Sequence, residues 1–482
     1  MKVLIFDTWL APFHVGTALE IAETHKEKGD EVQYVNIAAS LPFIEVHHAN
    51  KRSEHWVLRK KYANIKAMCK RGGVPCSFKT GLSPWFNFSL PPHLQTIADL
   101  KAWEYEGLDL GMAILSSLIS KSKDIEPDLV KYRSALNQIA HACIKTLASF
   151  KYWCNKFNPD RVYFVNGRTA LTRPMLRYCE LNGIDFRTHE RGGNENMNSY
   201  SIHTTFLHDL ESYNRIIEAH WEESRHTEDE RIAIADAFFA RLRSGKKQWI
   251  AFHNLMQEGL LPPEFDTKNY NVVFFTSSIT EFAAIDSRNN TETLFPSQFE
   301  SVRFIANTLA GIPNVKFYVR LHPNTKKAFK NEYQRWLTFL SEMGDKLIWI
   351  DGDSGVDSYS LMRMCNKVLV SYSTIGIEAS YYDKPVIATM KARYHKLGST
   401  YSPANLDELR TWLIDRQLPP KPRIGAMKFA YFQMTWGIPF KYYTPESRFK
   451  GKYRGVDLDA INITRFDRFI MACLNRFKID SL

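Results

Sequence analysis

The sequence has few of the features that mark membrane-embedded, disulfide-linked or secreted proteins. No uncharged apolar run approaches the ~18 residues that a transmembrane helix needs. Seven cysteines, an odd number without a repeating spacing, favour reduced thiols and give no zinc-binding pattern. The opening residues 1–16 have a short apolar core that Asp7 interrupts, which is unlike a signal peptide. We therefore expect a cytoplasmic protein with no membrane-spanning helix.

Two common nucleotide-binding motifs are absent as well. The chain contains neither GxxxxGK followed by Ser or Thr, nor a GxGxxG after a predicted strand. These absences disfavour kinases and dehydrogenases.

Length and composition suit a soluble protein of two domains. A chain of 482 residues is too long for one ordinary core and fits two domains of roughly 200 residues each. Charged residues make up 24%, and the high aromatic share of 13% favours sheet cores or sugar-stacking surfaces. The net charge of +11 fits nucleic acid, an anionic membrane or an anionic substrate as a partner. Because no nucleic-acid-binding module is recognisable, we expect no nucleic-acid partner.

Strands alternate with helices along most of the chain, which predicts parallel α/β sheets. Residues 2–37 read as strand, helix and strand, and the same order returns at 160–189. A second series begins at Asn271 and runs to Ile387. We therefore predict two Rossmann-like, doubly wound domains facing a cleft. The predicted boundaries are 1–265 with a helical insertion at about 50–155, then 266–420, then a C-terminal helical segment at 421–482 that packs back on the first domain.

Small polar residues follow three strands of the second predicted sheet. They are Ser277 and Ser278 after the first strand, His322 and Asn324 after the next, and Ser373, Thr374, Gly376 and Glu378 after a third. Taken singly, the hydroxyls can cap helices, the histidine can be structural, and the acid can complement a helix dipole. However, parallel strands bring their carboxyl ends to one edge, where ligands bind in open α/β sheets. Together these residues predict a nucleotide-phosphate site, with Glu378 placed to accept hydrogen bonds from ribose.

Several motifs resemble those of capsule polysaccharide biosynthesis proteins. They are HPN at 322–324, STIGIE at 373–378 and DKPVI at 383–387 in the second half, and FVNGR at 164–168, HERGG at 189–193 and the opening residues in the first half. This family consists of bacterial glycosyltransferases of the two-Rossmann GT-B type and includes Kdo transferases. The resemblance touches both halves but covers the insertion and the end after residue 420 weakly. The SxxGxE and HPN pieces also occur in UDP-sugar 2-epimerases of the same fold.

The resemblance implies that the second domain binds a nucleotide-sugar donor through the strand-end residues, with His322, Ser373 and Thr374 at the phosphate. The first domain then holds the acceptor, with Asn166, Arg168 and Arg191 as candidate substrate contacts. Arg168 either binds an anionic group bidentately or, like Arg191, forms an ion pair with Glu190.

An inverting transferase needs a base that takes the proton of the acceptor hydroxyl. Candidates at the carboxyl edge of the first sheet are Glu190, His14, His189 and Asp7, of which Glu190 is preferred because it follows a predicted strand directly. The glycines at 192 and 193 are expected to keep the approach to it uncrowded.

The expected function is transfer of a sugar from a CMP-Kdo-like, UDP-linked or GDP-linked donor to a growing bacterial surface glycan, capsule or lipopolysaccharide. We expect an inverting, metal-independent reaction without a cofactor, because GT-B enzymes generally bind the donor without a metal. Asp351-Gly352-Asp353 then reads as a turn. The acceptor is a glycan or lipid-linked glycan, and the basic run 51–71 suits contact with the anionic inner membrane. The alternative is a sugar-nucleotide 2-epimerase of the same fold, which needs no acceptor.

Overall fold

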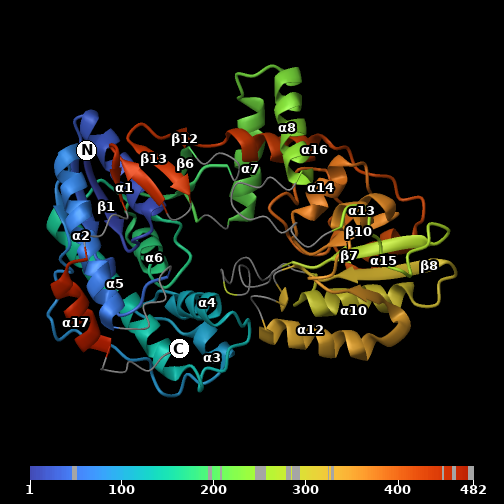
Figure 1. The fold of residues 1–482 in the computed structure, drawn as a ribbon, viewed down its shortest axis with the longest axis horizontal. Coiled ribbons are helices and arrows are strands. Elements are labelled where there is room, and N and C mark those ends of the chain that lie inside the picture. Colours follow the sequence, from blue (N-terminus) through green and yellow to red (C-terminus); the bar gives the residue numbers. More distant parts are fainter. Residues whose placement is uncertain are drawn as a thin grey trace.

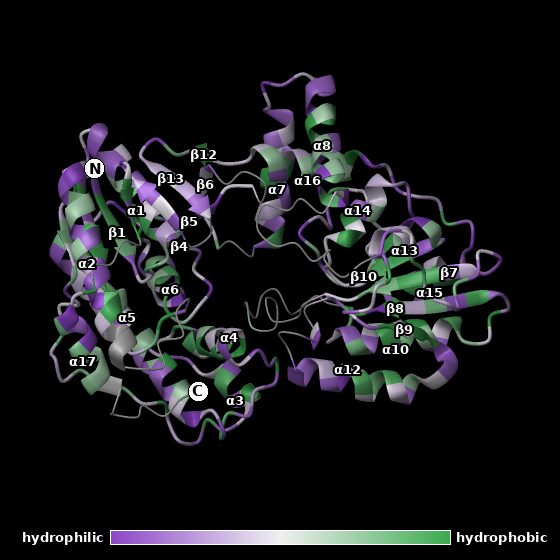
Figure 2. Cartoon of the chain, viewed as in Figure 1, coloured by the Kyte–Doolittle hydropathy of each residue, from purple (hydrophilic) through white to green (hydrophobic). Residues whose placement is uncertain are grey.

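The computed structural model describes residues 1–45, 52–193, 198–206, 209–244, 257–277, 284, 294–323, 325–326, 330–447, 450–458 and 463–475. Within them the chain forms two α/β units that lie side by side (Figure 1). Figure 2 shows hydrophobic residues concentrated in the strands and in the helix faces turned toward them. No helix in this described part is both long and apolar enough to cross a bilayer.

The first sheet has the strand order β12–β6–β5–β4–β1–β2–β3. Its strands are β1 (Lys2–Asp7), β2 (Glu31–Asn36), β3 (Cys76–Ser77), β4 (Arg161–Val165), β5 (Phe186–Arg191), β6 (Ser199–His203) and β12 (Ile438–Pro439). The five strands from β5 to β3 pair in parallel, whereas β6 and β12 add antiparallel pairs at one edge. Strand β1 reads as a continuous apolar run because helices cover both faces of the sheet.

Helices of the first unit form two layers around this sheet. They are α1 (Pro12–Glu27), α2 (Arg52–Gly72), α3 (Ile97–Ala102), α4 (Leu110–Ser122), α5 (Arg133–Phe157) and α6 (Arg173–Asn182). Helices α4, α5 and α6 enclose one core, and α1 and α2 enclose the other. The interval predicted as a helical insertion therefore runs from α2 to the greater part of α5.

The second sheet has the order β11–β10–β7–β8–β9 and is parallel throughout. Its strands are β7 (Tyr270–Phe275), β8 (Val315–Arg320), β9 (Ile348–Ile350), β10 (Lys367–Val370) and β11 (Val386–Ala388). Helices α10 (Gln298–Leu309), α12 (Lys330–Met343) and α15 (Leu406–Ile414) cover one face, and α13 (Ser358–Met364) and α14 (Ile375–Tyr381) cover the other. The prediction of two Rossmann-like α/β units is confirmed.

Three helices form a further core beside the second unit. They are α7 (Leu210–Glu222), α8 (Glu228–Arg243) and α16 (Ile424–Thr435), and they pack together with α14. Sequence analysis grouped α7 and α8 with the first domain, because they precede the linker. Their apolar faces are buried here instead, and Phe239 of α8 stacks on Tyr381 of α14 with ring centroids 3.9 Å apart.

After α16 the chain crosses back to the first unit. Strand β12 joins the first sheet, β13 (Tyr443–Ser447), β14 (Lys450–Tyr453) and β15 (Val456–Asp457) form a small antiparallel sheet against α1, and α17 (Arg465–Asn475) packs on α2. The carboxylate of Glu20 fixes this return by accepting the backbone N–H groups of Lys441, Tyr442 and Tyr443 at 2.7, 2.8 and 3.0 Å. The segment expected to be helical thus contains four strands besides the helices α16 and α17.

Candidate functional site

The ends of β10, β7 and β8 lie side by side, because these strands are neighbours in the parallel sheet. The ends of β7 and β8 are joined directly by hydrogen bonds. The backbone N–H of His322 donates to Thr276 Oγ1 at 2.8 Å, and the N–H of Thr276 donates to the Arg320 carbonyl at 3.0 Å. The three predicted polar segments therefore meet at one edge of the second sheet.

Ser277 is buried and held by Gln298 at the start of α10. Its N–H donates to Gln298 Oε1 at 2.8 Å, and Gln298 Nε2 donates to its carbonyl at 2.9 Å. Within the described residues, Ser277 Oγ makes no hydrogen bond. Ser278 and Asn324 lie outside the described residues.

The turn before α14 is packed against Tyr394, whose hydroxyl donates to the Ser373 carbonyl. A Cβ at Gly376 would lie 2.4 Å from that hydroxyl oxygen, so this position requires glycine. Sequence analysis explained the glycine by the close approach of a ligand, whereas the structure explains it by the approach of Tyr394. Thr374 is exposed at the N-cap position, and its side chain makes no capping hydrogen bond.

Glu378 lies beneath the surface and is 4% exposed. Its Oε2 accepts a hydrogen bond from the Tyr359 hydroxyl of α13 at 2.6 Å. Sequence analysis missed Tyr359 as the partner of Glu378, because Tyr359 lies on another helix and outside every motif. The contact between Glu378 and a ribose stays a prediction.

In the first unit, Glu190 lies on β5 beside the end of β4 and is half-buried. Asn166 Nδ2 donates to its Oε2 at 3.2 Å, and the N–H of Arg191 donates to its Oε1 at 3.2 Å. Burial raises the pKa of Glu190, but the charges of His14 and Arg191 and the hydrogen bond from Asn166 outweigh it, so the pKa falls below its usual value. Glu190 is therefore ionised at neutral pH, the form that a general base requires.

Two other candidate bases are buried instead. His189 is 1% exposed, and burial together with the charge of His14 lowers its pKa to about 3. Asp7 is also 1% exposed, and it accepts hydrogen bonds from the Trp9 N–H at 2.8 Å and the Tyr34 hydroxyl at 3.1 Å. Both side chains belong to the interior of the unit.

Arg168 is directed away from Glu190. Its Nε donates to Ser116 Oγ on α4 at 3.1 Å. Burial raises the pKa of Glu45, and the nearby charge of Arg168 opposes part of that rise. The structure thus brings together Glu190, His14, Asn166 and Arg191, while Arg168 faces α4.

Gly192 and Gly193, which follow Glu190 and Arg191, are closely packed against the end of α16. A Cβ at Gly193 would lie 2.2 Å from the carbonyl oxygen of Gln433, and the Gly193 N–H donates to the Trp436 carbonyl at 2.7 Å. Sequence analysis explained these glycines by an uncrowded approach of the acceptor, whereas the structure explains Gly193 by the close backbone of Gln433 at the end of α16.

Asp351 and Asp353 lie in a turn after β9, and Lys326 pairs with both, at 3.2 and 2.9 Å. The Tyr333 hydroxyl also donates to Asp351 Oδ2 at 2.6 Å. Across the residues that the structure describes, no group of three or more His, Cys, Asp or Glu side chains is arranged for a metal ion.

Comparison with known proteins gives a family match in the second unit. Residues 286–433 match the model of the family described as capsule polysaccharide biosynthesis protein. This stretch contains the motifs at 322–324, 373–378 and 383–387, so the predicted resemblance to the capsule polysaccharide biosynthesis glycosyltransferases is confirmed over these residues. The motifs of the first half lie outside the matched region. No curated protein matches the chain.

Three solved structures illustrate the remote likenesses of the chain. The β-Kdo 2,4-transferase KpsC of Thermosulfurimonas dismutans is 12% identical, with coverage of 66% of this chain and 87% of that chain and a TM-score of 0.37. The UDP-GlcNAc 2-epimerase of Neisseria meningitidis bound to UDP-GlcNAc is 13% identical, with coverage of 99% and 100% and a TM-score of 0.28. The spinosyn rhamnosyltransferase SpnG is 10% identical, with coverage of 90% and 96% and a TM-score of 0.27. These TM-scores are below 0.5, and none of the three likenesses supports an inference about activity.

Proposed function

We propose, from the family match over residues 286–433, that the chain is a glycosyltransferase of capsule polysaccharide biosynthesis. It transfers a sugar from a nucleotide-sugar donor to a growing surface glycan of the capsule or lipopolysaccharide type. The donor is linked to CMP, UDP or GDP, and the transfer inverts the anomeric centre without a metal. The observation that carries the proposal is that the matched stretch includes the polar ends of β8 and β10, which meet at one edge of the sheet.

In the proposed reaction, the two units have different tasks. The second unit holds the departing nucleotide phosphate with His322 and the exposed Thr374 hydroxyl, and Glu378 lies near the ribose. Glu190 of the first unit accepts the proton of the acceptor hydroxyl while that oxygen bonds to the anomeric carbon. The bond from this carbon to the phosphate oxygen breaks, and the nucleotide leaves with the electron pair. The charge that His14 and Arg191 place beside Glu190 supports its ionised form.

A transfer assay tests the proposal. The purified chain is incubated with CMP-Kdo, a UDP-sugar or a GDP-sugar, with and without a capsule oligosaccharide, and the released nucleotide is measured by chromatography. We expect release from one donor only when the oligosaccharide is present. Glu190→Gln should slow this release by about 100-fold or more, and Glu104→Gln, at an exposed glutamate of the same unit, should leave it unchanged. Conversion of a UDP-sugar to its 2-epimer without an acceptor would contradict the proposal and favour the epimerase.

We also propose that the chain contacts an anionic membrane through α17 and the neighbouring basic helix α2. Phe466 and Phe469 of α17 are 65% and 63% exposed, with exposed arginines at 465 and 468. Asp467 anchors the helix on α2, because it accepts from Trp56 Nε1 at 3.0 Å and pairs with Lys60 at 2.6 Å. Exposed rings beside cationic side chains are typical of helices that lie in a membrane interface.

Vesicle flotation tests the membrane contact. Phosphatidylglycerol vesicles should carry the protein upward, and phosphatidylcholine vesicles should not. The double variant Phe466→Ser, Phe469→Ser should reduce binding, whereas Leu406→Ser, an exposed apolar residue of α15, should leave it unchanged. Equal flotation of all three proteins would contradict the assignment of α17.

A further inference from the structure

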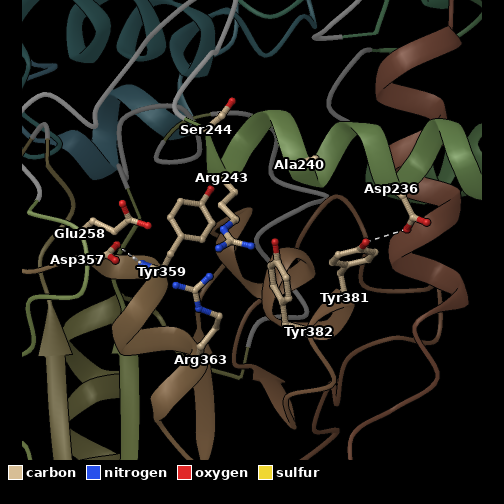
Figure 3. Close-up of a pocket in the computed structure, with 10 residues that line it drawn as sticks. All are labelled: Asp236, Ala240, Arg243, Ser244, Glu258, Asp357, Tyr359, Arg363, Tyr381 and Tyr382. Carbon is tan, nitrogen blue, oxygen red and sulfur yellow. Dashed lines mark hydrogen bonds between the residues drawn. The ribbon is translucent and has the colours of Figure 1, made fainter.

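A cavity of about 670 Å³ lies between the C-terminal half of α8, the segment 257–259, α13 and the end of α14 (Figure 3). The side chains that matter most in its lining are Arg243, Glu258, Asp357, Tyr359, Arg363 and Tyr382. None of the described residues predicted to bind the donor or to act as base lines it. The cavity adjoins the predicted ribose position only through Tyr359, whose hydroxyl donates to Glu378.

Two arginines from different helices face the same part of this cavity. Figure 3 shows the guanidinium groups of Arg243 and Arg363 pointing into the space between the rings of Tyr359 and Tyr382. Both positive charges act on Tyr382 and oppose the rise that burial causes in its pKa. Two like charges this close to one ring make the space between them attractive to an anion.

Neither arginine has a carboxylate partner among the described residues. Arg243 makes no hydrogen bond or ion pair there, and Arg363 donates only to Ser360 Oγ, at 3.4 Å. The buried carboxylate of the lining, Asp357, already accepts hydrogen bonds from its neighbours. Asp357 accepts from Ser360 Oγ at 2.5 Å, from the Tyr359 N–H at 3.0 Å and from the Gly259 N–H at 3.2 Å.

We propose that this cavity binds a phosphate monoester carried by a sugar ring. A phosphate dianion neutralises both guanidinium groups and suits their planar, bidentate geometry. The cavity is far larger than a phosphate group, and the tyrosine rings offer flat faces for a sugar. The exposed side chains of Glu258 and Ser244, both in the lining, supply polar partners for sugar hydroxyls. This site is separate from the proposed donor site and does not depend on the proposed function.

Isothermal titration of the full chain with glucose 1-phosphate, with CMP and with inorganic phosphate tests the proposal. We expect the esters to bind, and Arg243→Gln and Arg363→Gln each to weaken that binding by about tenfold or more. The matched control Arg410→Gln, on α15 and outside the cavity, should leave the affinity unchanged. Tyr382→Leu should weaken the esters but not inorganic phosphate, because only the esters carry a ring that reaches it.

Three results would overturn the proposal. They are no binding of glucose 1-phosphate, binding of glucose 1-phosphate that both arginine variants retain, and binding of glucose 1-phosphate that His322→Ala abolishes as well, since this ester would then occupy the donor site. Arg243 is exposed, so Arg243→Gln should fold, and an unchanged melting temperature verifies this. The titrations use neither a nucleotide-sugar donor nor an acceptor. Their outcomes can therefore be told apart from a failure of the transfer assay.

Discussion

Replacing Asp7 by Asn should stabilise the protein at alkaline pH and leave transfer activity in place. Burial raises the pKa of Asp7 from 3.8 to about 7, although the Trp9 N–H and the Tyr34 hydroxyl donate to its carboxylate. The folded state therefore holds this proton more tightly than the unfolded state. The contribution of Asp7 to stability is most favourable below the unfolded pKa and is lost as the pH rises toward the folded pKa.

The size of the effect follows from the two pKa values. The difference between 3.8 and about 7 corresponds to about 4 kcal/mol of destabilisation at pH 8. About 2.5 kcal/mol of this destabilisation develops between pH 5 and pH 8. Asparagine carries no charge and keeps an oxygen that can accept from the Trp9 N–H.

Urea unfolding followed by tryptophan fluorescence measures the free energy of unfolding of the wild type and of Asp7→Asn at pH 5 and pH 8. Comparing the two proteins at each pH cancels the contributions of the other titrating groups. We expect the free energy of unfolding of Asp7→Asn, relative to wild type, to increase by more than about 1 kcal/mol from pH 5 to pH 8. An unchanged difference would refute the reasoning, because a buried carboxylate at residue 7 would then not govern stability.

Three further substitutions test other parts of the account. Glu190→Gln should slow transfer by about 100-fold or more and leave nucleotide affinity unchanged, because the base lies in the other unit; steady-state kinetics and titration check this, and a parallel loss of affinity would contradict it. Burial raises the pKa of Glu332 to about 7, so Glu332→Gln should flatten the fall in melting temperature between pH 5 and pH 8; an identical pH profile would argue against it. Gly376→Ala should cost about 1–3 kcal/mol in unfolding experiments, because the new Cβ would lie 2.4 Å from the Tyr394 hydroxyl oxygen; wild-type stability would show that Tyr394 moves aside freely.

The α/β architecture could be predicted because buried parallel strands such as β1 and β7 are continuous apolar runs. Strand order then brings the polar ends of β7, β8 and β10 together. Contacts between distant segments leave no local signal, so the pairing of Tyr359 with Glu378 could not be predicted. For the same reason the motif around Glu190 predicted an acid at the sheet edge, but not that Gly193 beside it packs against the end of α16.

A thermal-shift panel of CMP, UDP, GDP, TDP and ATP, on wild type and on His322→Ala, tests the central claim most directly. A ligand at 100 times its dissociation constant adds about 2.7 kcal/mol to stability, which raises the melting temperature measurably. We predict that one pyrimidine or guanine nucleotide stabilises the wild type and fails to stabilise the variant. If no nucleotide stabilises a correctly folded wild type, the polar strand ends of the second sheet are only structural and the transferase proposal is contradicted.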